Sequence, residues 1–187
     1  MALTVIWPKD MFPRTKVLHP FQKPWVMEAM NHIPEEYPIH LVLIGNNMDN
    51  EKNRAIINDK PSEHKIHFLG YRTDVLNIVK ASNAFILSST KGEATTKAVI
   101  EAMSLGIAPI ITDIPGNRGL VIDGECGYVV PPAHPKKLAE AMIKLFEDRN
   151  RCLIFGEKAK QHIQDHFNIA TTINKTKSLY ETLTRAI

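Results

Sequence analysis

Six short apolar runs alternate with helical patterns along the chain, and this alternation limits the possible fold more than any other feature. The runs are rich in Val, Ile and Leu and are bounded by Gly, Pro or polar residues. They are nearly continuous in their apolarity, which is typical of strands buried on both faces of a sheet. The predicted strands are residues 3–8, 39–45, 66–70, 83–89, 107–113 and 127–132.

Segments with a helical period separate and follow these strands. In the longer ones, apolar residues recur every three or four positions, as they do along one face of a helix. The predicted helices are residues 23–33, 73–82, 95–106, 134–148 and 168–187. Strands that alternate with helices pair in parallel through right-handed crossovers. The sequence therefore predicts an α/β fold, a single Rossmann-like domain with a six-stranded, mostly parallel sheet and helices on both faces.

The composition fits one globular domain over residues 1–187, with 44% hydrophobic and 23% charged residues. Residues 9–22 are predicted as an irregular basic loop and residues 134–187 as C-terminal helices. A net charge of +3 is too small to indicate a nucleic-acid partner. The two cysteines have no metal-ligand spacing. Among the eight histidines, His162 and His166 are four apart, and we interpret them as part of a solvated helix rather than as metal ligands. We therefore predict no metal and a reducing compartment such as the cytoplasm.

The carboxyl ends of the strands are the expected place for a ligand in a doubly wound fold. Lys9 follows the first predicted strand, Gly45 the second, and Tyr71 and Arg72 the third. Tyr71 and Arg72 could flank a nucleobase, and an ordinary surface turn is an equally good interpretation. IGNN at residues 44–47 has a single glycine, so the dinucleotide fingerprint of dehydrogenases is absent.

The fourth strand leads into a loop and then into a helix predicted to begin near Thr95. The free N–H groups and the dipole at a helix start favour phosphate, and the hydroxyl of Thr96 and the charge of Lys97 add to this. Glu93 precedes the helix and Glu101 lies eight residues later, at most ~12 Å along the axis. The two glutamates are either solvated charges or acceptors for hydroxyls at the two ends of one nucleotide sugar.

SSTKGEATTKAVIEAMSLGIAPIITDIPGNRGLVIDGECGYVVPP, residues 88–132, resembles the E-x7-E region of the family-four retaining glycosyltransferases. LVLIGNN, KIHFLGYRTDV and VKASNAFILSS occur in the order found in that family's donor-binding domain. The resemblance covers about residues 23–165 and implies one half of the two-domain GT-B fold. It also implies that Glu93 faces the donor sugar and that Glu101 holds the ribose. The backbone groups that meet sugar and phosphate in the family correspond to Ala94, Thr95, Thr96 and Lys97.

A basic pair on the diphosphate is also implied by the resemblance. Lys23 suits the member at the start of the first helix. For the other member we prefer Lys9, and Arg14 and Lys16 are alternatives within the basic loop. Glu93, Lys23 and Lys9 are therefore the predicted catalytic residues, and Arg14 is a further donor-binding candidate.

The function implied is binding of a nucleoside-diphosphate sugar, such as a UDP- or GDP-sugar, and its transfer with retention and without a metal cofactor. The acceptor, a glycan or a lipid-linked glycan, would bind an N-terminal domain that is missing from these residues. We therefore expect a fragment or a subunit that is inactive alone, and any peripheral membrane contact would come from the missing half. Two alternatives stay open: a non-catalytic nucleotide-sugar-binding subunit, and a nucleotide-sugar epimerase.

Overall fold

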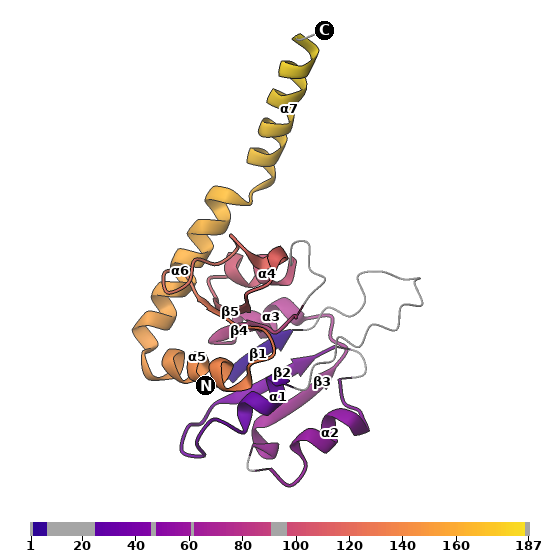
Figure 1. Cartoon of the computed structure of the whole chain (residues 1–187), viewed down its shortest axis with the longest axis vertical. Helices are drawn as coiled ribbons and strands as arrows, with labels where there is room; N and C mark the ends of the chain where they lie inside the picture. Colours follow the sequence, from indigo (N-terminus) through magenta and orange to yellow (C-terminus); the bar gives the residue numbers. More distant parts are fainter. Residues whose placement is uncertain (1, 7–24, 46–47, 61, 91–96, 186–187) are drawn as a thin grey trace.

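The computed structural model describes residues 2–6, 25–45, 48–60, 62–90 and 97–185, and these form one parallel sheet between two layers of helices (Figure 1). The order of the strands across the sheet is β3-β2-β1-β4-β5-β6, and every neighbouring pair is parallel. The predicted α/β class is confirmed. The strands are β1 (Ala2–Ile6), β2 (His40–Ile44), β3 (Ile66–Gly70), β4 (Ala84–Leu87), β5 (Ala108–Thr112) and β6 (Tyr128–Val130).

Seven α-helices occur in the described residues. Two 3-10 turns, η1 (Glu63–Lys65) and η2 (Pro115–Asn117), precede β3 and follow β5. Helix α2 was not predicted; it starts at Asn50, whose side chain accepts a hydrogen bond from the N–H of Asn53. The helices are α1 (Trp25–Met30), α2 (Glu51–Ile57), α3 (Val75–Lys80), α4 (Lys97–Ser104), α5 (Pro135–Glu147), α6 (Arg149–His166) and α7 (Ile169–Arg185).

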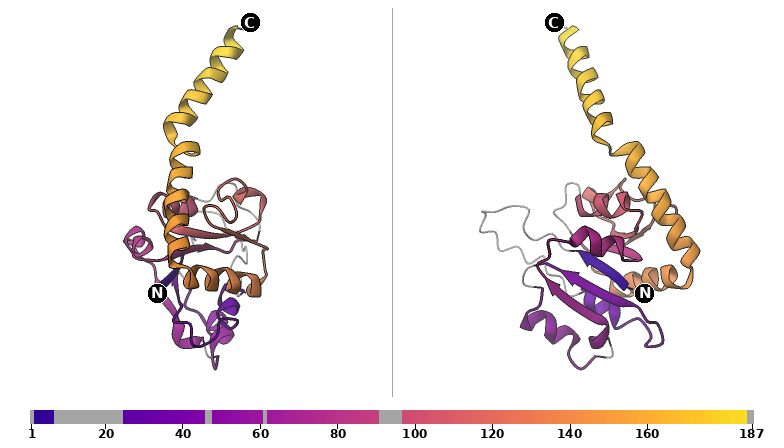
Figure 2. Two further views of the ribbon diagram at one scale, coloured as in Figure 1. Left: turned by 90° about the vertical axis from the view of Figure 1, so that its left-hand side faces the viewer. Right: turned by 180° about the vertical axis from the view of Figure 1, so that it is seen from behind.

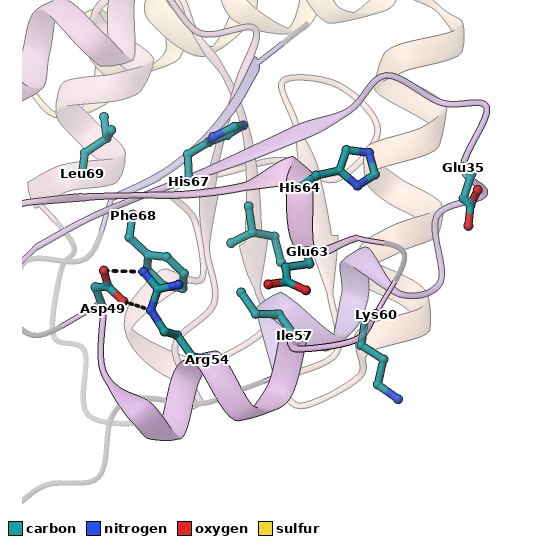
Figure 3. A pocket seen from close by; sticks show the side chains of 11 residues that line it. Glu35, Asp49, Arg54, Ile57, Lys60, Glu63, His64, His67, Phe68 and Leu69 are labelled. Atoms are coloured by element: carbon teal, nitrogen blue, oxygen red, sulfur yellow. Dashed lines mark hydrogen bonds and ion pairs between the residues drawn. The ribbon is translucent and has the colours of Figure 1, made fainter.

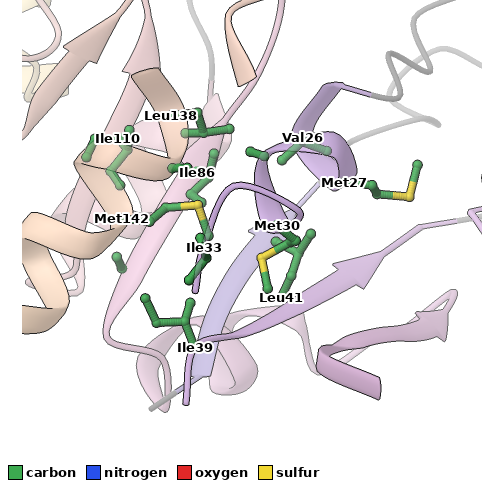
Figure 4. Packing of buried hydrophobic residues seen from close by; sticks show 14 of the residues in the cluster. Val26, Met27, Met30, Ile33, Ile39, Leu41, Ile86, Ile110, Leu138 and Met142 are labelled. Carbon is green, nitrogen blue, oxygen red and sulfur yellow. The ribbon is translucent and has the colours of Figure 1, made fainter. Parts of the chain in front are cut away.

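Each face of the sheet has its own apolar core. On one face, Ile86 and Ile110 pack with α1 and α5, and Figure 4 shows Leu138 and Met142 of α5 beside them. On the other face, side chains of the same strands pack with α3 and α4. All residues of β4 and β5 are buried. The continuous apolar runs therefore do reflect strands covered on both sides.

Helix α6 joins the two cores. Phe155, near its start, belongs to the core of α1 and α5, whereas Ala159 and Ile163 belong to the core of α3 and α4. The crossing needs a close approach at Gly156, where an added Cβ would clash with the carbonyl oxygen of Gly106. Gly106 has φ +75° and ends the turn after α4, at the last residue of the helix range predicted from the sequence.

Helix α7 continues from α6 and extends away from the sheet and its covering helices (Figure 2). Apart from the half-buried Thr171, its side chains from Ile169 to Thr184 are exposed. Among the helices that the structure describes, none is both long and apolar enough to cross a membrane.

Candidate nucleotide-sugar site

The order of the strands places a topological switch point between β1 and β4. The chain goes from β1 outward through β2 to β3, and from β4 outward through β5 to β6. In open α/β sheets the crevice outside the carboxyl ends of the strands at such a point is the usual ligand site. Several predicted site residues lie outside the described residues: Lys9, Arg14, Lys23, Glu93, Ala94, Thr95 and Thr96. Their roles stay predictions.

Helix α4 carries Lys97 in its first turn and Glu101 one turn later. The Lys97 ammonium lies 3.3 Å from a carboxylate oxygen of Glu101, and the two side chains are 66% and 38% exposed. Exposed pairs of this kind contribute at most about 1 kcal/mol. A ligand could therefore separate the two groups at little cost, and a full charge would then be available from Lys97 at the start of the helix and from Glu101 one turn later.

Gly45, Tyr71 and Arg72 lie together at the ends of β2 and β3. The N–H of Gly45 donates to the carbonyl of Gly70 at 2.9 Å, which joins the two strand ends. Tyr71 is 67% exposed. Its ring is available to stack on a planar ligand, which is the use that the sequence suggested.

Arg72 is engaged by its neighbour Asp74. Two hydrogen bonds, of 2.8 and 2.7 Å, join the guanidinium to the carboxylate. They raise the pKa of Arg72 and lower the pKa of Asp74. Asp74 is the residue before α3, and its side chain makes no capping hydrogen bond there because the arginine binds it. Arg72 therefore presents a largely neutralised charge to a ligand.

Two hydroxyl groups lie just past β4, in the stretch where the sequence placed the ligand site without giving either residue a role. The hydroxyl oxygens of Ser88 and Thr90 are buried and have no hydrogen-bond partner among the described residues, and the same holds for the indole nitrogen of Trp25 at the start of α1. Buried polar atoms without partners are uncommon, and each costs about 1–3 kcal/mol. Because α1 and β4 both reach the carboxyl edge of the sheet, these three groups mark the region of the switch point.

A separate hollow of about 760 Å³ lies outside β3, the edge strand, and is lined in part by α2 (Figure 3). There, Arg54 makes two hydrogen bonds to Asp49 and lies over the ring of Phe68. Of the predicted donor-binding residues that the structure describes, none lines this hollow. It is three strands away from β4 and does not belong to the candidate site.

Neither cysteine has the environment of a reactive thiol. Cys126 and Cys152 are buried and unpaired, and burial raises the pKa of both thiols. In the described ranges, no group of three or more His, Cys, Asp or Glu side chains could hold a metal ion. The described part of the site therefore offers hydroxyls, one lysine and one carboxylate, which suit a polar organic ligand.

Comparison with known proteins identifies the family of the chain. Residues 25–162 match the family model described as glycosyl transferases group 1. The chain belongs to this family. The resemblance seen in the sequence is thereby confirmed at the level of the family, and the fold is one half of the GT-B type.

Two curated relatives named as glycosyl- or galactosyltransferases are considerably longer than this chain. The chain is 29% identical over 163 residues to an uncharacterized glycosyltransferase of Methanocaldococcus jannaschii, covering 84% of this chain and 41% of that protein. It is 30% identical over 122 residues to the UDP-Gal:alpha-D-GlcNAc-diphosphoundecaprenol alpha-1,3-galactosyltransferase of Escherichia coli, covering 65% and 31%. The chain thus spans less than half the length of these relatives.

Solved structures share the fold. HepE of Anabaena, in complex with UDP and glucose, aligns with a TM-score of 0.77 at 21% identity, covering 98% of this chain and 48% of that one. TarM of S. aureus, in a complex that includes alpha-GlcNAc-glycerol and UDP, aligns with a TM-score of 0.80 at 19% identity, covering 96% and 35%. At these identities the likeness concerns the fold alone.

Proposed function

We propose that this chain is the donor-binding half of a retaining glycosyltransferase that takes a nucleoside-diphosphate sugar, with UDP as the first candidate nucleotide. The acceptor would be a glycan or a lipid-linked glycan, bound by a second half outside these 187 residues, and the pathway would be the synthesis of a polysaccharide or related glycan. The observation that carries the proposal is the switch point itself. There, the start of α4, with Lys97 and Glu101, follows a strand end whose buried hydroxyls have no partner in the part of the chain that the structure describes.

The arrangement suits the length of a nucleoside diphosphate. Three strand spacings separate β3, which ends beside Tyr71, from β4, and at ~4.8 Å each they span about 14 Å. In the proposed pose Tyr71 meets the base and Glu101 accepts from the ribose hydroxyls. The diphosphate lies at the start of α4, where free N–H groups and Lys97 favour negative charge.

The proposed chemistry depends on stabilising the departing diphosphate. Bond cleavage at the anomeric carbon leaves negative charge on the diphosphate, and donors already fixed at a helix start stabilise that charge without reorganising. We propose that the reaction needs no metal and that Glu93, Lys23 and Lys9 complete the site as the sequence predicted. In this scheme the leaving phosphate takes the proton of the acceptor hydroxyl, so no general base is required from this half.

The relatives favour UDP and a lipid-linked acceptor. HepE has been solved with UDP-glucose, and the Escherichia coli relative is a transferase for a diphosphoundecaprenol-linked sugar. The partial coverage of these relatives also keeps a second candidate open, a nucleotide-sugar-binding subunit that acts only with a separate acceptor-binding chain.

Calorimetry on the 187-residue chain tests donor binding. We expect UDP to bind more tightly than GDP or ADP, with an affinity in the high micromolar to millimolar range because the second half is missing. Glu101→Ala should weaken UDP binding about tenfold, since it removes charge-assisted hydrogen bonds to the ribose.

Glu140→Ala on α5 is the matched control for Glu101→Ala. Glu140 also pairs with a lysine one turn away, and its side chain is 40% exposed, against 38% for Glu101. It lies on the other layer of helices and should leave UDP binding unchanged. If no nucleotide bound at millimolar concentration, or if both variants behaved alike, the donor site would be wrong.

A further inference from the structure

A second cavity opens at the same edge of the sheet, two strands beyond β4. It has a volume of about 480 Å³ and is lined by residues that follow β5 and β6. Tyr71, Lys97 and Glu101, the described residues assigned above to the nucleotide and the diphosphate, do not line it. At ~4.8 Å per strand, the carboxyl end of β6 is about 10 Å from that of β4. The cavity is thus about 10 Å from the end of β4, where the donor sugar would lie.

The floor of this β5–β6 cavity is rigid and tied to the candidate site. Thr112 is fully buried, and its hydroxyl donates to the carbonyl of Ser89, just past β4. The buried amide of Asn117 donates to the carbonyl of Thr112 at 3.0 Å. The carbonyl of Gly119 accepts a hydrogen bond of 2.9 Å from His162 on α6. These bonds fix the loop after β5 against both β4 and α6.

The rim carries charged groups that remain accessible. Arg118 lies 3.2 Å from Asp113, with side chains 70% and 52% exposed. One carboxylate oxygen of Asp123 accepts from the N–H of Val129 at 2.8 Å, which leaves its other oxygen free to accept from a ligand. Two carboxylates and one guanidinium make the rim net negative. A phosphate or an acidic sugar is therefore disfavoured, whereas a neutral group with several hydroxyls can use both kinds of charge.

The remaining wall is apolar. Val130, Pro131 and Pro132 line it together with Val129. A wall of this kind suits the C–H face of a sugar ring, while the ring hydroxyls reach Asp113, Arg118 and Asp123. Convergent polar groups beside an apolar surface in a cavity of several hundred Å³ are the usual composition of a small-molecule site.

We propose that the β5–β6 cavity binds a neutral sugar residue of the acceptor, beside the donor sugar. This proposal rests on the proposed function, because the acceptor must reach the anomeric carbon of a donor held at the switch point. The donor-binding half would then select the acceptor as well as the donor, through Arg118 and Asp113.

NMR titration of the ¹⁵N-labelled chain tests this proposal. The probes are methyl α-glucoside, methyl α-galactoside, methyl α-N-acetylglucosaminide and methyl glucuronide, each with and without saturating UDP. We expect at least one neutral glycoside to shift the amide signals of residues 113–132 at millimolar concentration and the glucuronide to bind more weakly. Arg118→Ala should weaken the neutral glycoside about tenfold, because a charged hydrogen-bond donor is lost.

Arg54→Ala is the matched control. Arg54 pairs with an aspartate five residues earlier, as Arg118 does, but it lies outside β3. This variant should leave glycoside binding unchanged, and Arg118→Ala should leave UDP binding unchanged. The proposal is overturned if glycosides shift signals elsewhere or not at all, or if Arg118→Ala has no effect. The proposal is also overturned if the chain binds a sugar only when that sugar is attached to UDP. A chain that binds glycoside but no nucleotide would instead contradict the proposed donor site.

Discussion

The same kinds of apolar residue are buried in the sheet and exposed on helix α7. Every residue of β4 and β5 is buried, and Ile86 and Ile110 are fully inaccessible to solvent. On α7, Ile169 and Ile173 are 74% and 57% exposed, and Tyr180 and Leu183 continue the same stripe. Neither apolar core includes a residue of α7 in the described part of the chain.

This difference shows that an apolar stripe at helical spacing does not by itself indicate that a helix contributes to stability. An apolar stripe at helical spacing occurs both on α5, where Leu138 and Met142 are fully buried, and on α7, where it is exposed. The pattern predicts a helix in both cases, but only a packed surface supplies hydrophobic free energy to folding. The sheet with α1 to α6 should therefore unfold as one unit, with α7 contributing little to it.

The largest effect should come from the same substitution made in the two regions. Ile110→Ala removes a buried side chain between β5 and the α1–α5 layer, and we expect it to lower the free energy of unfolding by about 3–4 kcal/mol. Ile173→Ala on α7 should change it by less than about 0.5 kcal/mol. Urea unfolding followed by circular dichroism measures both. Comparable losses in the two variants would show that α7 is part of the folding unit.

The next largest effect on the free energy of unfolding should come from the close contact of α6 with the turn after α4. Gly156→Ala would gain about 1 kcal/mol of helix propensity. However, the new Cβ meets the backbone oxygen of Gly106, which cannot rotate away as a side chain would. Overpacking of this kind outweighs the gain, and we expect a net loss of about 2 kcal/mol in the free energy of unfolding.

Gly124→Ala separates this clash from the general effect of replacing a glycine. Gly124 has φ +74°, and an added Cβ would meet no atom within 4 Å. At this position only the strained backbone should lower the free energy of unfolding, by about 1 kcal/mol. If Gly156→Ala were neutral or stabilising, the close contact of α6 with the turn after α4 would be wrong.

The fold was predictable because its signals are local. Continuous apolar runs identified all six strands, and their alternation with helices led to a parallel sheet. Helix α2 was missed because it has only seven residues, and its apolar residues, one alanine and two isoleucines, are consecutive. They therefore show no helical period. The signal that was available was Asn50 followed by Glu51, a capping residue and an acidic first turn.

The site was less predictable because its details depend on neighbours distant in the sequence. Glu101 and Lys97 could be named from spacing within one helix. The pairing of Arg72 with Asp74 depends on side-chain conformations that spacing does not determine. The buried state of Ser88 and the cavity between β5 and β6 depend on which strands and helices pack around them, and the sequence alone does not order these elements.

The smallest expected effect compares one isosteric substitution in the two regions. Thr90→Val replaces a buried hydroxyl, which has no partner within the described ranges, with a methyl group of the same shape. We expect the free chain to become more stable by about 1 kcal/mol, because the penalty of an unsatisfied buried group is removed. UDP should bind a few-fold more weakly if that hydroxyl serves the ligand.

Thr182→Val on α7 is the counterpart. The hydroxyl of Thr182 is exposed and donates to the carbonyl of Ser178 at 2.9 Å, so its loss should alter neither the unfolding of the sheet nor UDP binding. Thermal unfolding with and without UDP measures both quantities for both variants. A stabilised Thr90→Val chain that binds UDP as tightly as the original would mean that the hydroxyl is a packing defect. A Thr90→Val chain that is less stable than the original would mean that the hydroxyl has a partner in the folded chain. The paired loss of affinity and gain of stability is the signature of a group kept for binding, because selection for stability alone would remove it.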